Sequence, residues 1–236
     1  MLLMPGRWPQ LSLLFSILLS RSVSADVFVR EDIIVDPDPG AFSICFDYTC
    51  KEVTTVSLGQ DKWRQIQALF TPRVTDAAVE RQRVAEAVSL LEKWTGEIVG
   101  TANDKGGNVK GFSAAGHQMD CIDESTNTTT YMVMLSREQL LQLHTVEDRS
   151  TRGFFIFGMP HTTAVLKDRS TGQKWAVDSW FHDNGVAPEV VPLSQWRSGW
   201  EPLSSVPQAV GGKTPEAGTV GHKVNASSPP PEIFIR

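Results

Sequence analysis

The 236-residue chain has little cysteine, no excess of basic residues and only one marked apolar run. These shortages limit, in turn, the disulfides it can form, the charged partners it can attract and the membrane spans it can contain. It carries 22 basic and 27 acidic side chains, a formal net charge of -5. Such a surface has no general attraction for nucleic acid or anionic lipid, so neither is expected as a partner. The apolar run, Leu11 to Leu19, is shorter than the roughly 20 residues that a membrane-spanning helix needs.

Cysteine occurs three times, which leaves one residue over if the chain is exported and forms a disulfide. Cys45 and Cys50 are close enough in sequence to form that disulfide if the segment between them turns. Cys121 is then a free thiol. Two alternatives stay open: Cys121 pairs with one of the other two, or all three are reduced. A disulfide at Cys121 would exclude it as a nucleophile.

The chain start has the composition of a secretory signal. Arg7, the apolar run and the small residues up to Ala25 predict that residues 1–25 are cleaved, with an uncleaved anchor as the alternative. Cleavage removes two arginines and no acids, so 20 basic and 27 acidic side chains remain, a charge of -7. We therefore expect an exported protein, periplasmic or extracellular, with no transmembrane segment after cleavage.

Composition divides the rest of the chain into one domain and a tail. Residues 26–203 are expected to form a single domain of α+β class, long enough to bury a core. Residues 204–236 are rich in proline, glycine and serine, which predicts a disordered tail. Within the domain we expect an extended arm over 26–60, helices over 61–69, 75–94 and 137–144, and a buried strand over 153–158. Glu80 is expected on the solvated face of its helix.

Cys121 is expected at or near the start of a helix. Acids follow in the first turn, at Asp123 and Glu124, and apolar residues come later, as at a helix N-terminus. The helix dipole favours thiolate over thiol and is expected to lower the pKa of Cys121, which makes the sulfur a better nucleophile. The neighbouring acids act in the opposite direction.

His161 and Asp178 are expected on the two strands of one hairpin. Residues 162–167 and 173–180 have strand composition, and Asp168 to Gly172 is turn chemistry. If Arg169 and Ser170 form a two-residue loop, His161 and Asp178 lie directly opposite each other, about 5 Å apart at Cβ. A loop longer by two leaves them diagonal on the same face, whereas a one-residue slip separates them.

The order Cys121, His161, Asp178 resembles that of the transglutaminase-like branch of the papain-like cysteine enzymes. The segments that carry the resemblance are Met119-Asp120-Cys121-Ile122-Asp123, His161-Thr162-Thr163-Ala164-Val165 and Trp175-Ala176-Val177-Asp178. They are similar to the G-D-C-E-D and H-x-W-x-x-V … W-x-x-x-D signatures of bacterial transglutaminase-like cysteine proteinases. Met119 and Thr163 depart from these patterns, and the likeness spans about residues 90–185.

The resemblance implies a transglutaminase-like fold in which the helix that carries the nucleophile packs on an antiparallel sheet. It also implies a catalytic triad of Cys121, His161 and Asp178. Gln118 is a candidate donor to the oxyanion, with an ordinary loop hydrogen bond as the alternative. Some bacterial relatives bind calcium beside the nucleophile, which makes Asp120 and Asp123 candidate ligands; otherwise they cap the helix.

The function expected is an exported cysteine hydrolase that cleaves peptide or amide bonds through a thioester acyl-enzyme. Its partner would be a protein or peptide substrate of the cell envelope; we expect a monomer, and no cofactor is required, calcium being optional. The alternatives are a transglutaminase-type acyltransferase, an idle domain that binds peptide or cell wall in the same cleft, and a purely structural protein. A transition-metal site from His117, Cys121 and His161 is a further alternative, although it lacks a compact ligand spacing.

Overall fold

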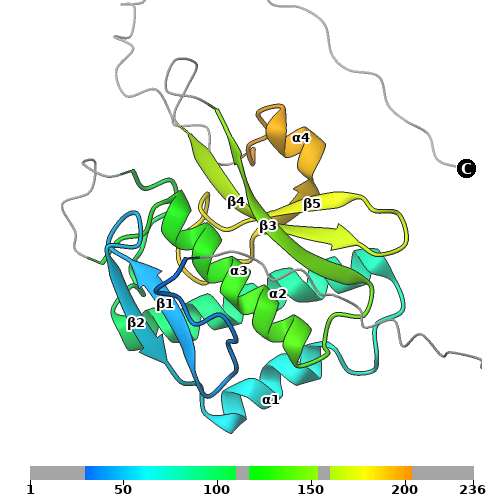
Figure 1. Ribbon diagram of the computed structural model, residues 1–236, viewed down its shortest axis with the longest axis horizontal. Coiled ribbons are helices and arrows are strands. Elements are labelled where there is room, and N and C mark those ends of the chain that lie inside the picture. Colours follow the sequence, from blue (N-terminus) through cyan, green and yellow to red (C-terminus); the bar gives the residue numbers. More distant parts are fainter. Residues whose placement is uncertain (1–29, 110–116, 154–159, 204–236) are drawn as a thin grey trace, which may run out of the picture.

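The protein is described here by a computed structural model that covers residues 30–109, 117–153 and 160–203 (Figure 1). The expected signal segment 1–25 and the expected tail 204–236 lie outside these residues. Helices and antiparallel strands follow one another along the described chain, so the α+β class is confirmed.

Two antiparallel sheets and four helices make up the described part of the chain. A hairpin of two strands comes first, and a four-stranded meander in the order β3-β4-β5-β6 comes last, with three of the helices between them. The elements are β1 (Phe42–Phe46), β2 (Glu52–Val56), α1 (Gln60–Leu69), α2 (Ala77–Val99), α3 (Cys121–Arg137), β3 (His144–Arg152), β4 (His161–Asp168), β5 (Lys174–Asp178), β6 (Glu189–Pro192) and α4 (Leu193–Arg197).

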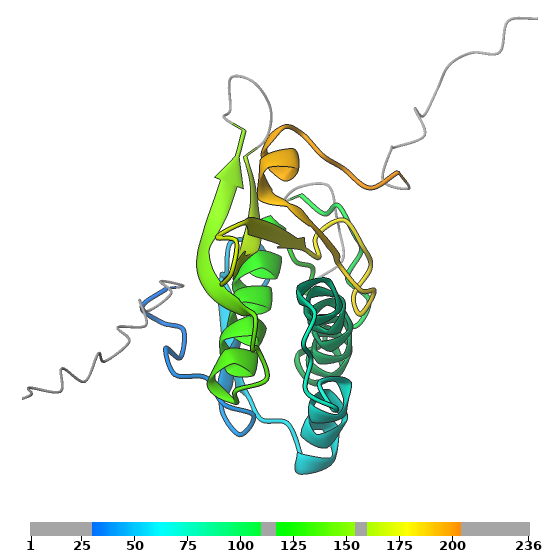
Figure 2. The ribbon, with the colours of Figure 1, turned by 90° about the vertical axis from the view of Figure 1, so that its right-hand side faces the viewer.

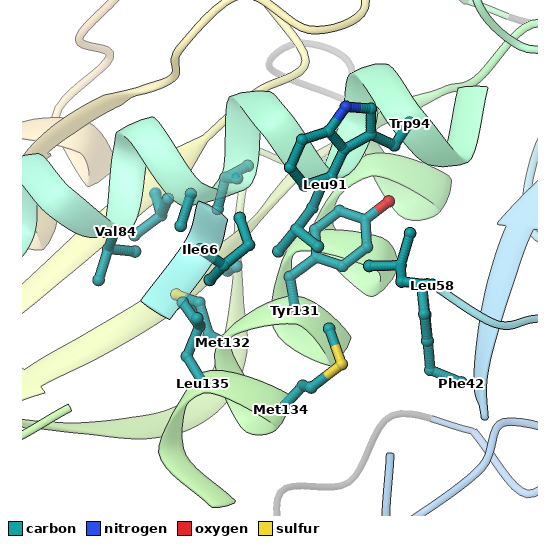
Figure 3. Close-up of a cluster of buried hydrophobic side chains, with 14 of the residues drawn as sticks. Phe42, Leu58, Ile66, Val84, Leu91, Trp94, Tyr131, Met132, Met134 and Leu135 are labelled. Carbon is teal, nitrogen blue, oxygen red and sulfur yellow. The ribbon is translucent and has the colours of Figure 1, made fainter. Parts of the chain in front are cut away.

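Helix α3 lies in the middle of the fold, with the meander on one side and α1 and α2 on the other (Figure 2). It is almost wholly buried, and its partners include β1 as well as the sheet. Apolar side chains from α2 and α3 meet in the core, where Leu91 packs near Tyr131 (Figure 3). Tyr131 satisfies its hydroxyl with Thr95 Oγ1 at 2.7 Å, so this polar group is buried at little cost.

The expectation of an extended arm over residues 26–60 was wrong for residues 42–56, which form the β1–β2 hairpin. The strand β1 is buried at every position, whereas β2 is mostly exposed. Asn127 of α3 clamps β1 by accepting the Cys45 N–H and donating to the Cys45 carbonyl oxygen, both at 2.8 Å. Because β1 is held by a side chain far along the sequence, local composition does not identify it.

The helix expected over residues 137–144 was also wrong. Helix α3 ends at Arg137, Gln139 has a φ of 58°, and His144 begins β3. Glu80, expected on a solvated face, is buried and binds this turn: its carboxylate accepts the backbone N–H groups of Gln142, Leu143 and His144. The strand expected over 153–158 falls almost wholly outside the described residues.

Among the described residues, no helix is both long enough and apolar enough to cross a bilayer.

Candidate active site

Cys121 is the first residue of α3, where the sequence places it. The Asp120 carboxylate caps the helix by accepting the N–H groups of Ile122 and Asp123 at 3.0 and 3.1 Å. Asp123 accepts the Asp120 N–H at 3.0 Å, which completes a capping box. These bonds orient the first turn and so the direction of the Cys121 side chain.

His161 and Asp178 lie on neighbouring strands, β4 and β5. Asp168 pairs with Gln173 around the loop 169–172, and Ala164 lies opposite Val177. The loop is therefore two residues longer than the two-residue loop considered above, and His161 and Asp178 are diagonal on one face rather than directly opposite. Their side chains meet on one face, with His161 Nε2 2.7 Å from Asp178 Oδ2.

The His161 imidazole is enclosed by aromatic rings. Trp180, Phe181 and Trp196 have ring centroids 4.6, 5.2 and 5.5 Å from it, and the His161 residue is only 7% exposed. Its other nitrogen, Nδ1, is buried and has no hydrogen-bond partner among the described residues. Because Nε2 is engaged by a carboxylate, the tautomer favoured here carries its proton on Nε2 and leaves a free lone pair on Nδ1.

The Cys121 sulfur lies against the backbone on both sides of His161. It is 3.9 Å from the Pro160 carbonyl oxygen, and the Thr162 N–H donates toward it. Burial, with smaller contributions from the charges of Asp120 and Asp178, raises the pKa of the Cys121 thiol to about 11. The lowered pKa expected from the helix dipole was therefore wrong, because desolvation of the thiolate outweighs the dipole.

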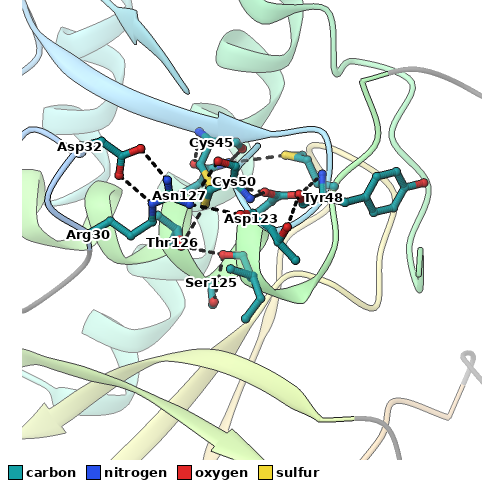
Figure 4. The surroundings of a disulfide bond; sticks show 12 residues. Arg30, Asp32, Cys45, Tyr48, Cys50, Asp123, Ser125, Thr126 and Asn127 are labelled. Atoms are coloured by element: carbon teal, nitrogen blue, oxygen red, sulfur yellow. Dashed lines mark hydrogen bonds and ion pairs between the residues drawn. A yellow bond between two sulfur atoms is a disulfide. The ribbon is translucent and has the colours of Figure 1, made fainter. Parts of the chain in front are cut away.

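Cys45 and Cys50 form a disulfide with a Cα–Cα distance of 4.8 Å, and Cys121 is the free cysteine (Figure 4). The disulfide closes a turn in which residues 47–50 have φ values of 67°, 65°, 59° and 53°, a left-handed run without glycine. Such a run costs roughly 1–2 kcal/mol per residue and needs external support.

Asp120 and Asp123 supply that support. Asp123 accepts the N–H groups of Tyr48 and Cys50 at 2.8 and 2.6 Å, and Asp120 accepts that of Thr49 at 3.0 Å. Burial, followed by the charge of Asp120, raises the pKa of Asp123 to about 7. Each of the four oxygens of the two carboxylates already accepts a backbone N–H, which favours capping over calcium binding.

The buried Gln118 side chain bonds to the loop 103–108. Its Oε1 accepts the Lys105 N–H at 3.2 Å, and its Nε2 donates to the Asn103 carbonyl oxygen at 3.3 Å. These are the loop hydrogen bonds that the sequence leaves as the alternative to an oxyanion role. Donation by the second amide hydrogen to an oxyanion stays a prediction.

The described residues contain one cluster with metal-ligand spacing, Cys45, Cys50 and Asp123, but its two sulfurs are joined in the disulfide. His117 is exposed and packs on Phe46 with centroids 5.6 Å apart. The grouping of His117, Cys121 and His161 considered above is therefore not among the clusters found in this part of the chain.

Trp196 is a site residue that sequence reasoning missed. It lies in α4, is fully buried, and its Nε1 donates to Asp178 Oδ2 at 2.6 Å. The Arg152 guanidinium stacks on the Trp196 ring at 4.5 Å and donates to the Trp200 carbonyl oxygen at 2.7 Å. No spacing in the sequence connects a tryptophan in a five-residue helix to a carboxylate on β5.

Comparison of the chain with models of protein families, with curated proteins and with solved structures gives no match.

Proposed function

We propose that the protein is an exported cysteine hydrolase of the transglutaminase-like class that cleaves a peptide or amide bond of a cell-envelope substrate. Cys121 is the nucleophile, His161 the base and Asp178 the group that orients the base. The observation that carries this proposal is the His161–Asp178 pair beside the backbone that Cys121 contacts. Asp178 holds Nε2, and Nδ1 is buried without a hydrogen-bond partner among the described residues, Cys121 included. The free thiol of Cys121 contacts the backbone of Pro160 and Thr162, on either side of His161.

The reaction follows from these positions. Nδ1 of His161 takes the thiol proton as the Cys121 sulfur attacks the carbonyl carbon. The tetrahedral intermediate collapses to a thioester, and the leaving amine takes the proton from Nδ1. Water then adds to the thioester with His161 as base, which releases the acid and restores the thiol. Asp178 holds the tautomer and stabilises the imidazolium that forms in each half.

The resting nucleophile is a thiol in this account. Because burial raises the pKa of Cys121 to about 11, proton transfer to His161 accompanies attack rather than preceding it. The N–H groups of Cys121 and Thr162 donate toward the sulfur and favour negative charge there. The Cys121 N–H, which donates toward its own sulfur in the resting site, is the proposed oxyanion donor once the sulfur is bonded to the substrate, since the next two N–H groups of α3 are used by the Asp120 cap. No step needs a cofactor.

The alternative is an idle domain that binds peptide or cell-wall material through the same region. The raised pKa of Cys121 is the observation that favours it, because a thiol of this kind reacts slowly without a base. The thioester acyl-enzyme can react with water or with an amine. Water would make the protein a hydrolase, and an amine would make it a transglutaminase-type acyltransferase. The resemblance of the motifs to bacterial proteinases favours water.

The test is the rate at which iodoacetamide alkylates Cys121 near neutral pH, followed by intact mass. His161→Ala is expected to lower that rate by at least about 10-fold. The matched control is His182→Ala, because His182 forms a similar imidazole–carboxylate pair with Glu189 at 2.7 Å. Equal rates in the wild type and both variants would contradict the proposal and favour the idle domain.

A further inference from the structure

Three buried acids lie between α2, α3 and the end of β5, and the proposed reaction does not use them. They are Glu92 on α2, Asp104 in the loop that follows α2, and Glu124 on α3. None is more than 4% exposed. Ser179, the residue directly after Asp178, lies among them.

Ser179 connects the helix that carries Cys121 with the end of the strand that carries Asp178. Its hydroxyl donates to Glu124 Oε2 at 2.9 Å and lies 3.1 Å from Thr128 Oγ1. Glu124 is three residues beyond Cys121 on α3, while Ser179 follows Asp178 on β5. This hydrogen bond therefore links the helix that carries the thiol to the strand end that carries the carboxylate.

The same network reaches the chain just before Cys121. Glu124 hydrogen-bonds to Asp104, and Asp104 Oδ1 accepts the Met119 N–H at 2.8 Å. Glu92, on α2, also hydrogen-bonds to Ser179. The network thus includes Glu124, three residues after the proposed nucleophile, contacts the backbone two residues before it, and reaches Ser179, the residue after the orienting carboxylate.

We propose that this acid network, Glu92, Asp104 and Glu124 around Ser179, is the positioning element that holds the strand end carrying Asp178 against the helix carrying Cys121. The inference rests on the proposed function for its catalytic meaning, but the structural link can be tested without it.

The number of available hydrogens limits which of the three acids can be ionised while all of these hydrogen bonds are formed. A serine hydroxyl has one hydrogen, so Ser179 can donate to only one of Glu124 and Glu92, and the other acid must be protonated to form its own hydrogen bond with Ser179. Likewise, Glu124 and Asp104 can bond directly only if they share a proton. Asp104, which accepts a backbone N–H, is the member suited to carry charge.

The buried environment agrees with this assignment. Burial raises the pKa of Glu92 to about 8 and that of Asp104 to about 6, and it raises the pKa of Glu124 well above its usual range. Glu92 Oε1 is buried with no hydrogen-bond partner among the described residues, so ionisation would leave a carboxylate oxygen unsolvated.

The groups that face Glu92 offer it no positive charge among the described contacts. Asp104 and Glu124 are acids, Tyr131 from α3 is neutral, and the Ser179 hydroxyl and Gly185 N–H are uncharged. Ionisation of Glu92 therefore adds repulsion against Asp104, and the network is expected to open as pH rises through about 8.

The test uses DTNB, a bulky thiol reagent, on Cys121 of the full protein between about pH 6 and about pH 9.5, spanning the Glu92 transition. Glu92→Gln keeps the shape and cannot ionise. The ratio of the wild-type rate to the E92Q rate is expected to be near 1 at the acid end and to rise by at least about 5-fold at the alkaline end. Glu97→Gln, on the exposed face of α2, is the matched control and should follow the wild type.

A flat ratio would overturn the inference. If E92Q does not fold, Ser179→Ala removes the link directly and is expected to raise the DTNB rate already at the acid end; an unchanged rate would overturn the inference equally. The outcome is separable from the proposed function, because the ratio does not depend on His161. If the DTNB rate ratio stays flat while alkylation of Cys121 depends on His161, only the positioning role of the network is rejected. If the ratio rises while alkylation does not depend on His161, only the proposed enzymatic function is rejected.

Discussion

Trp196 and Asp178 are joined by a hydrogen bond of 2.6 Å, and it ends on the same carboxylate oxygen that His161 approaches at 2.7 Å. Asp178 Oδ2 thus receives two N–H donors in a buried site. A carboxylate held by two donors cannot rotate freely, so the indole fixes the oxygen that orients the imidazole.

Trp196→Phe is expected to lower the His161-dependent alkylation rate of Cys121 by about 3- to 10-fold. The substitution keeps the aromatic ring beside His161 and removes only the donor to Asp178, a bond to a charged group worth about 1.5–3 kcal/mol. Trp175→Phe is the control, because the Trp175 N–H has no partner among the described residues. A loss of equal size in both variants would assign the effect to packing.

Asp178→Asn tests which nitrogen of the His161 imidazole carries the proton. The asparagine amide would donate to Nε2 and move the imidazole proton to Nδ1, the nitrogen that must accept the thiol proton. We expect the alkylation rate to fall to that of His161→Ala, with less than about 2 kcal/mol lost in the free energy of unfolding. Wild-type reactivity in this variant would show that Asp178 does not act through His161.

The Cys45–Cys50 disulfide should stabilise the protein by restricting the unfolded chain. Closing a short loop contributes about 2 kcal/mol by chain entropy alone, and opening it also releases residues 47–50 from the strained φ region. Because release of this strain offsets part of the entropy loss, reduction, or the double substitution of Cys45 and Cys50 by serine, is expected to lower the free energy of unfolding in denaturant by up to about that amount. Cys121→Ser should leave it nearly unchanged; the reverse ranking would contradict the assignment of the pair.

Stability should fall as pH rises from about 4.5 to about 8. The unfolded chain releases the Glu92 proton near pH 4.3, whereas the folded chain keeps it to about 8, so the native state binds more protons in that window. Each unit of difference is worth about 1.4 kcal/mol. Asp104 and Asp123, with raised pKa values of about 6 and 7, act in the same direction.

Denaturant unfolding at the two ends of this window measures the effect. Glu92→Gln should flatten the dependence on pH, since one titrating group is removed, and Glu97→Gln should not. A wild-type stability that rises across the window would contradict the buried, neutral state of Glu92.

The order of Cys121, His161 and Asp178 and the local structure around all three could be predicted from the sequence. The first-turn acids place Cys121 at a helix start, and turn residues at 168–172 place His161 and Asp178 on one face of a hairpin. These signals are local: caps and turns depend on residues a few positions apart.

The rest depends on contacts that no local pattern encodes. Strand β3 is polar and lies at the sheet edge, so its composition does not alternate. Glu80 is buried because it binds a turn some 60 residues away, and Trp196 meets Asp178 only through the packing of α4. The raised pKa of Cys121 also depends on distant contacts, because burial by other elements outweighs the dipole of its own helix.

The most direct test of the central claim is acyl transfer to Cys121. The protein is mixed with p-nitrophenyl acetate near neutral pH, quenched in acid, and mapped by peptide mass spectrometry. The account predicts a single acetyl thioester on Cys121 in the wild type, none in Cys121→Ser, and much slower formation in His161→Ala than in His182→Ala. Acetylation confined to lysines, or a Cys121 adduct that forms equally fast without His161, would contradict it.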